Sequence, residues 1–225
     1  MNKTSLKLLT ALAACFSVCN AQANLLNNGS FDIGVGAVGG LTSLTGWTVV
    51  RGNIDLVSTE YFGLTAADGD FAVDLTGSLA AGNISQSVET LSGEIYTLGF
   101  WFGGNPQWQY VGQTSNDSPI KSMDVLVGGI KLANFSVDTT GRAWSDASWI
   151  YKAVNFEAVS NSTQIEFNSL NSFGFFGPLL DGVSLEIAAP IAPIPEPETY
   201  ALMLAGLAMV GAAAKRKASR AKRLV

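Results

Sequence analysis

The sequence predicts an all-β protein whose main domain, residues 24–189, is an antiparallel jelly-roll β-sandwich. Three observations support this fold class. Short runs rich in β-branched and aromatic residues recur at intervals of about 8–12 residues, separated by Gly, Asn, Asp and Ser. No stretch of the domain keeps the apolar period of a helix, and proline is sparse before residue 190. The length of 225 residues allows one such domain with a short segment at each end.

Ten segments of the domain have the composition of β-strands. In the segment 95–102, Thr97, Gly99 and Trp101 lie on one face, and the large apolar side chains at the even positions lie on the other. Gly128-Gly129 predicts a two-residue hairpin turn. The ten predicted strands are Trp47–Val50, Ile54–Val57, Phe71–Leu75, Ile84–Glu89, Ile95–Phe102, Met123–Val127, Lys131–Phe135, Trp149–Phe156, Gln164–Phe167 and Gly182–Ile187.

The N-terminal segment has the features of a secretory signal peptide. Its first seven residues carry two lysines, and a short apolar run follows at 8–18. Ala21-Gln22-Ala23 is a small-x-small cleavage site, so we expect signal peptidase to remove residues 1–23. The four residues that end at Cys15, Leu-Ala-Ala-Cys, also fit the box that precedes a lipidated cysteine. Lipidation of Cys15 is therefore the alternative.

The C-terminal segment combines a proline-rich linker, 190–198, with an apolar run, 201–214, and a basic cluster. Fourteen helical residues span about 21 Å, against about 30 Å for the hydrocarbon core of a bilayer. Tyr200 and Lys215 can extend the span by lying at the two interfaces. We predict a transmembrane helix at about 199–214, with the domain facing outwards; a plain tail anchor or a buried core helix is the other reading.

The order of these C-terminal features resembles the PEP-CTERM sorting signal of exopolysaccharide-producing Gram-negative bacteria. The resemblance covers about residues 195–220. It implies that an exosortase, a membrane transpeptidase, removes the tail during delivery to the cell surface, in a biofilm or capsule setting. The residues that carry the motif are Pro195, Glu196, Pro197, Gly206, Lys215, Arg216 and Lys217.

The charge and the residue types of the domain exclude several functions. Between residues 24 and 194, 16 acidic residues face 5 basic ones, a net charge of −11, which disfavours binding of nucleic acid. The chain has no histidine, and its cysteines, Cys15 and Cys19, belong to the signal peptide. An ordinary zinc site and a Ser–His–Asp triad are therefore excluded, whereas calcium, which takes oxygen ligands, is not.

The opening stretch, Asn24–Asp32, resembles the first strand of galactose-binding-like jelly rolls, which include carbohydrate-binding modules and related plant cell-wall domains. Most of the domain resembles the choice-of-anchor C family of bacterial surface proteins. This resemblance implies the fold and no activity. The stretches that carry it are Trp47–Asp55, Asp68–Gly77, Ile84-Ser85-Gln86, Gly93–Tyr96, Gly104-Asn105-Pro106 and Gly177–Leu185.

One loop-like segment, 103–110, combines the side chains that bind sugars. Aromatic rings supply flat contact area, and Asn and Gln supply paired hydrogen bonds. A Trp and a Tyr two residues apart point the same way if the segment is extended. The alternative is that these rings cover the open end of the sandwich. Trp144 lies in a second polar stretch, with Arg142 and Asp146. The predicted carbohydrate-binding residues are Asn105, Gln107, Trp108, Tyr110 and Trp144.

A structural calcium ion is predicted where the chain ends of the domain meet. Asp32 ends the opening motif, and Asp181 opens the final strand, which the jelly roll places beside the first. Calcium takes six to eight oxygen ligands at about 2.3–2.6 Å, and would offset the repulsion of the two carboxylates. In the other reading, Asp32 caps a turn and Asp181 is a surface residue. Asp68-Gly69-Asp70, which is close in sequence to Asp74, is predicted to be a turn before a strand; a cation ligand and, more remotely, a catalytic pair are the alternatives.

These features predict an exported, non-enzymatic jelly-roll module that associates with extracellular polysaccharide. A purely structural or adhesive surface protein is the alternative. A glycan hydrolase is the remote alternative, because the chain lacks the Glu-x-Asp-x-x-Glu strand of jelly-roll glucanases and a hydrolase needs two facing carboxylates.

Overall fold

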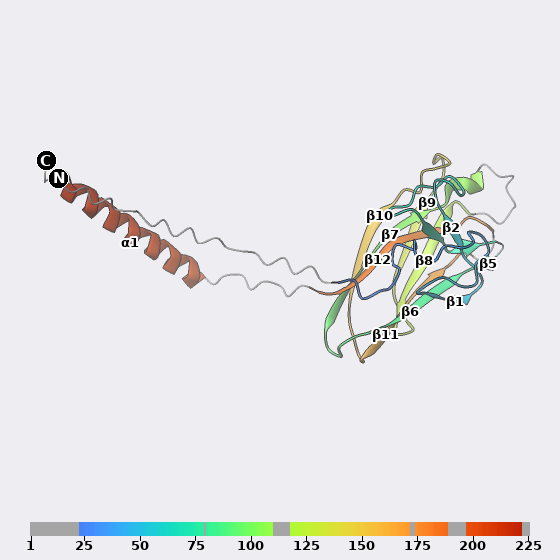
Figure 1. Ribbon diagram of the computed structural model, residues 1–225, viewed down its shortest axis with the longest axis horizontal. Helices are drawn as coiled ribbons and strands as arrows, with labels where there is room; N and C mark the ends of the chain where they lie inside the picture. Colours follow the sequence, from blue (N-terminus) through green and yellow to red (C-terminus); the bar gives the residue numbers. More distant parts are fainter. Residues whose placement is uncertain (1–22, 79, 110–117, 172–173, 189–196, 222–225) are drawn as a thin grey trace. The chain divides into compact units, whose positions relative to one another are not determined.

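The chain folds into two units, residues 1–188 and 189–225, which are described separately. Residues 1–22 of the predicted signal peptide, which include Cys15, lie outside the residues that the structure describes. The same is true of Tyr110, Pro195 and Glu196. The computed structural model (Figure 1) describes residues 23–78, 80–109, 118–171, 174–188 and 197–221.

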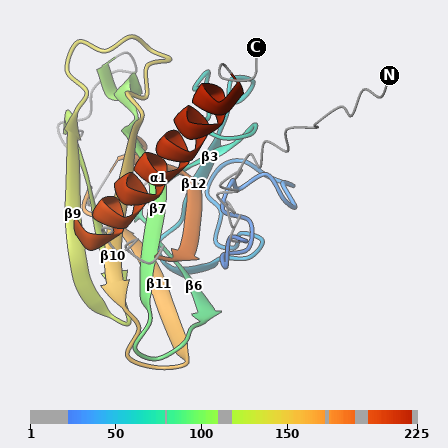
Figure 2. The same ribbon diagram turned by 90° about the vertical axis from the view of Figure 1, so that its left-hand side faces the viewer.

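The first unit is an all-β sandwich of two antiparallel five-stranded sheets (Figures 1 and 2). The first sheet has the order β1 (Thr48–Arg51), β6 (Asn83–Glu89), β11 (Ser162–Ser169), β8 (Ile120–Val127) and β9 (Ile130–Asp138). The second sheet has the order β10 (Ile150–Glu157), β7 (Ile95–Gly104), β12 (Pro178–Ile187), β3 (Ala72–Asp74) and β2 (Asp55–Val57). β4 (Thr76–Gly77) and β5 (Ala80–Ala81) pair with each other in a separate two-stranded sheet.

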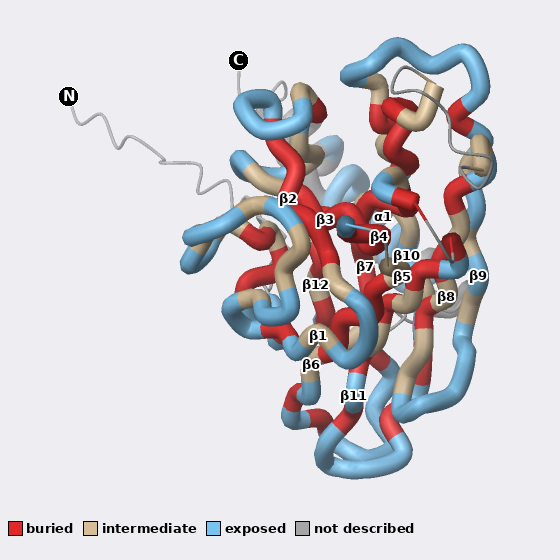
Figure 3. The backbone as a smooth tube through the Cα atoms, turned by 90° about the vertical axis from the view of Figure 1, so that its right-hand side faces the viewer, coloured by how far each residue is buried: buried red, intermediate tan, exposed pale blue. Residues whose placement is uncertain are grey.

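The core lies between the two sheets, and β7 supplies much of it. Its even-numbered residues from 96 to 102 are buried in the core, as the alternation in the sequence predicts. The Phe100 ring contacts the rings of Phe135 and Phe167 edge to face, with centroids 5.5 and 5.2 Å apart. Figure 3 shows buried residues along the strands and exposed ones in the loops at the ends.

All ten predicted strands are present, with ends that differ by a few residues, whereas β4 and β5 were not predicted. The hairpin turn is confirmed. Gly128 and Gly129 join β8 to β9 with φ values of 57° and 79°, which glycine adopts at no steric cost.

The opening stretch, 24–32, differs from the expected first strand. Asn28 and Phe31 have φ values of 54° and 62°, so the chain turns where an extended strand would need negative φ. The stretch nevertheless runs beside β12, because the Leu25 N–H donates to the Leu185 carbonyl at 3.0 Å. The two ends of the domain therefore lie side by side, as predicted, although the opening stretch is not a strand.

A second, smaller apolar cluster lies on the outer face of the second sheet. It consists of Val57, Leu64, Ala72, Ala147 and Leu179. Leu64 and Ala147 belong to loops, and the other three belong to strands. The loops that follow β2 and precede β10 therefore cover one end of this outer face and leave the remainder of the sheet open.

The second unit contains one described helix, α1 (Pro197–Ala221). It begins in the predicted sorting motif and continues past the apolar run through Lys215, Arg216 and Lys217, so it is longer than the predicted 199–214. In the described part of the chain, no helix is both long enough and apolar enough to cross a membrane. The transmembrane assignment therefore stays a prediction.

Candidate functional site

The loop predicted to bind sugar follows β7 and forms a 3₁₀ turn, η1 (Pro106–Gln109). The segment is therefore not extended up to Gln109. The condition under which Trp108 and Tyr110 would point the same way is not met there, and Tyr110 itself lies outside the described residues.

Two of the predicted sugar ligands are buried amides that hold this loop in place. Asn105 and Gln107 expose only 3% and 1% of their surface. The Asn105 side chain donates to Asp74 Oδ2 at 2.9 Å, and the Gln107 side chain donates to the Phe62 carbonyl. Because both amides are used inside the protein, the structure places them away from any sugar-binding surface.

Trp108 is half-buried in the same loop. Its indole N–H donates to Thr139 Oγ1 at 2.7 Å, and the Lys121 Nζ lies 6.0 Å from the centroid of its ring. The ring therefore joins the loop after β7 to the loop that follows β9. This role agrees with the alternative prediction, in which the ring covers the end of the sandwich.

Trp144 is exposed, as the prediction required, and a neighbouring loop brings two more rings to the same end. Its indole N–H donates to the Phe62 carbonyl at 3.1 Å, the same oxygen that Gln107 contacts. Trp144, Phe62 and Tyr61 expose 40%, 44% and 42% of their surface. We call these three residues the loop-end cluster. Sequence reasoning missed Tyr61 and Phe62, although two adjacent aromatic residues before a glycine in a loop were a usable signal.

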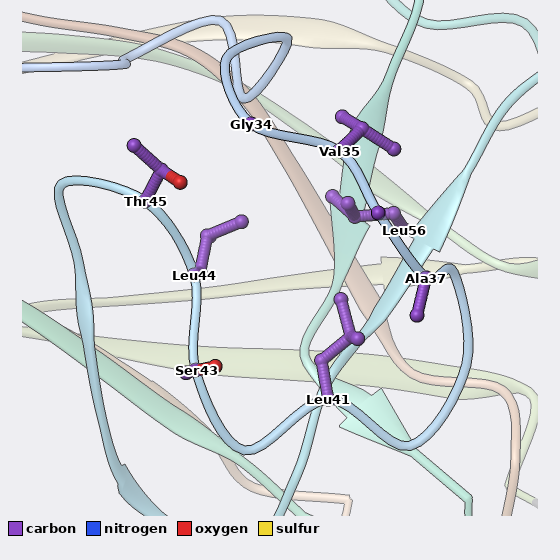
Figure 4. A pocket seen from close by; sticks show the side chains of 9 residues that line it. Gly34, Val35, Ala37, Leu41, Ser43, Leu44, Thr45 and Leu56 are labelled. Atoms are coloured by element: carbon purple, nitrogen blue, oxygen red, sulfur yellow. The ribbon is translucent and has the colours of Figure 1, made fainter.

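A hollow of about 530 Å³ lies between the loop 34–45 and β2 (Figure 4). Leu41, Leu44, Val35 and Leu56 line it together with the hydroxyl side chains of Ser43 and Thr45, and no charged side chain is among its lining residues. Sugars need polar groups that converge on the ligand. This hollow therefore offers little to recognise them.

The two carboxylates predicted to bind calcium both accept hydrogen bonds from one turn. Asp181 accepts from the backbone N–H groups of Ala67 and Asp68 at 2.7 and 2.8 Å. Asp32 accepts from those of Asp70 and Phe71 at 2.9 and 3.0 Å. The turn at 68–70 is confirmed, with Gly69 at φ 67°.

This arrangement does not supply a calcium shell. Backbone N–H donors occupy Oδ1 of Asp32 and both carboxylate oxygens of Asp181. Among the described residues, no three His, Cys, Asp or Glu side chains gather closely enough to hold a metal ion. Calcium binding by Asp32 and Asp181 therefore stays a prediction without a ligand set.

Buried carboxyl groups are the strongest electrostatic feature of the domain. Burial raises the pKa of Asp74 to about 7, although the hydrogen bonds from Asn105, Thr76 and Gly177 lower it. Burial also raises the pKa of Asp55, which pairs with Asp74 across β2 and β3. Both groups hold loops through backbone N–H groups, so we assign them to the structure and not to chemistry on a substrate.

The buried Asp181 carboxyl has a similar environment. Burial raises its pKa to about 7, against the backbone hydrogen bonds from Asp68, Gly182 and Ala67, which lower it. The Asp68 carboxylate adds a repulsion that raises this pKa further.

Several solved structures of carbohydrate-binding modules are similar to this chain. TmCBM61 in complex with β-1,4-galactotriose is 20% identical, with a TM-score of 0.46 over 73% of this chain and 99% of that one. A family 35 module from Clostridium thermocellum is 16% identical, with a TM-score of 0.44 over 68% and 98%. A family 16 module is 17% identical, with a TM-score of 0.43 over 72% and 99%. None of the curated proteins matches the chain.

Two family models match the sequence. The PEP-CTERM protein-sorting motif matches residues 193–217, so the predicted sorting signal is confirmed. The model named protein of unknown function, DUF642, matches residues 24–186 and thus most of the chain, whereas the choice-of-anchor C name is not confirmed. The chain therefore belongs to the DUF642 family and carries a PEP-CTERM sorting motif at its C-terminus.

Proposed function

We propose that this protein is exported, is processed by an exosortase and acts at the cell surface as a non-catalytic module that associates with extracellular polysaccharide. Before processing, the tail holds it at the inner membrane. The sorting motif supports the first half of the proposal. The exposed loop-end cluster carries the second half.

The mature protein should begin at Asn24 and end near Pro195–Glu198. The small-x-small site predicts the first cut, and the sorting motif predicts the second. The intact mass of the protein released from the cells measures both ends. A released species that retains residues 215–225 would contradict processing of the tail, and an acylated Cys15 would contradict cleavage at Ala23.

The loop-end cluster suits sugar binding because its rings are exposed while hydrogen bonds hold the loops that carry them. Gln107 and Trp144 both donate to the Phe62 carbonyl, which ties three loops together. A surface ordered before the ligand arrives loses less entropy on binding. The absence of histidine from the whole chain, and of cysteine after Cys19, rules out catalysis by either of these side chains after the signal peptide is removed.

Replacing Trp144 and Phe62 together by Ala should weaken retention on the host's own exopolysaccharide by roughly fivefold to thirtyfold. Loss of two stacking rings costs about 1–2 kcal/mol, which corresponds to this range. Affinity electrophoresis of the purified full chain gives the measurement. Val159→Ala is the matched control, because this side chain is 89% exposed in the turn between β10 and β11, away from the cluster.

The outcome separates the proposed function from its alternatives. Equal retention of the double variant and the wild type, with no thermal destabilisation, would contradict sugar binding at this cluster. A protein that binds no polysaccharide at all would favour a structural or adhesive role. Release of reducing ends from the polymer would overturn the non-catalytic assignment.

A further inference from the structure

We propose that the open outer face of the second sheet is a second polysaccharide-binding surface, specific for neutral chains. The proposal rests on the proposed function for the class of ligand but on different residues. Trp101, Tyr151 and Trp149 form this surface, which we call the sheet-face strip.

The register of the sheet brings the rings of Trp101 and Tyr151 together. Trp101 on β7 pairs with Tyr151 on β10, and both point away from the core, because the core residues of β7 occupy the alternate positions. Their ring centroids are 5.4 Å apart, with the planes at 68°. Trp149 precedes Tyr151 by two residues and so lies on the same side. Tyr151 exposes 51% of its surface, whereas Trp101 and Trp149 are half-buried.

Three glycines let these rings lie directly against the backbone of the sheet. A Cβ atom at Gly99 would lie 2.1 Å from the Tyr151 hydroxyl, and one at Gly182 would lie 2.9 Å from Cδ1 of Trp101. A Cβ atom at Gly103 would lie 2.9 Å from Cε3 of Trp149. Any side chain at these positions would lift the rings. The glycines therefore allow the aromatic rings to lie close to the backbone of the sheet, where a sugar ring can stack on them.

Polar groups lie beside the rings at the spacing of the strands. Ser184 pairs with Gly99, next to the Tyr151 hydroxyl. Thr97 donates to Asn155 at 2.9 Å on the same face. Hydroxyl and amide groups around aromatic rings are the usual composition of a sugar site. The strip thus has both components that the predicted loop was expected to combine.

The charges around the strip favour a neutral polymer. Glu157 and Glu186 are exposed on this face, and Asp68 lies beside Trp101 at Gly182. The strand residues described on this face include no Lys or Arg. Lys152 is next to Tyr151 in the sequence but points to the other side, where its Nζ lies 5.5 Å from the centroid of the Phe135 ring. A polyuronate would meet like charges with no basic partner.

The test compares affinity for soluble β-glucan, galactan, mannan and xylan with affinity for polygalacturonate, by affinity electrophoresis of the full chain. We expect Trp101→Ala and Tyr151→Ala each to lower affinity for the neutral polymer that binds best by roughly tenfold. Tyr151→Phe keeps the ring and should retain most of the affinity. Ile150→Ala is the matched control, because this exposed neighbour lies on the opposite side of β10.

Each outcome bears on one claim. If Trp101→Ala and Tyr151→Ala bind as the wild type does while the loop-end double variant fails, the sheet-face strip is wrong and the proposed function stands. If polygalacturonate binds as tightly as the neutral polymers, the charge argument is wrong. If the wild type binds no polysaccharide, the proposed function itself fails. Melting temperatures of all variants exclude unfolding as the cause.

Discussion

We expect the protein to unfold at a lower urea concentration at about pH 8 than at about pH 5. Asp74 and Asp181 are buried, and burial raises each pKa from 3.8 to about 7. Between these values the unfolded chain has lost the proton that the folded chain retains. Stability is therefore fully present below about pH 4 and is lost as the pH rises through about 7.

The size of this effect follows from the width of the window. Each such carboxyl lowers the free energy of unfolding by about 1.4 kcal/mol per pH unit between the two pKa values. From about pH 5 to pH 7 this amounts to about 3 kcal/mol for each group. A domain is stable by only about 5–15 kcal/mol, so the shift in the urea midpoint should be large.

Asp181→Asn is the matched variant for this pH dependence. It removes one titrating group and should make the slope of stability against pH clearly shallower, whatever its effect on stability itself. Asp138, which is exposed, gives the control through Asp138→Asn, which should leave the slope between pH 5 and 8 unchanged. Stability that is flat or that rises across this range would contradict the burial of protonated carboxyls.

Phe100→Ala should lower the free energy of unfolding by about 3–5 kcal/mol. The ring is fully buried at the centre of the core and packs edge to face on Phe135 and Phe167. Removing it leaves a cavity that both sheets line, and the surrounding side chains relax into such a cavity only in part. Urea unfolding at fixed pH gives the measurement.

Phe100→Leu serves as the graded comparison, because it keeps most of the apolar volume and should cost clearly less than Phe100→Ala. Val159→Ala removes an exposed apolar side chain and should change stability by less than about 0.5 kcal/mol. A loss for Phe100→Ala no larger than that for Val159→Ala would show that the sheets do not pack on this ring.

The sandwich could be predicted because apolar residues either alternate with polar ones or form short runs in its strands, and because residues typical of turns separate these strands. In β7 that alternation also placed Trp101 correctly on the outer face. The opening stretch could not be predicted in the same way. Asn28 and Phe31 adopt positive φ, and for Phe31 no local signal indicates this, because the conformation depends on the packing of Phe31 into the core.

The sugar site was harder to predict, because amides that bind a ligand and amides that hold a loop have the same sequence pattern. Asn105 and Gln107 look like sugar ligands until their partners, Asp74 and Phe62, are known. Those partners are remote in the sequence. The register that pairs Tyr151 with Trp101 was equally inaccessible, since strand pairing depends on the whole sheet.

The place of β12 determines when the domain can finish folding. This strand is the last in the chain, yet it is the middle strand of the second sheet, between β7 and β3, and the opening stretch also runs along it. The earlier strands therefore have an unfilled position until residues 178–187 arrive. For a polypeptide that crosses a membrane from its N-terminus onwards, nearly the whole domain must emerge before the sheet can close.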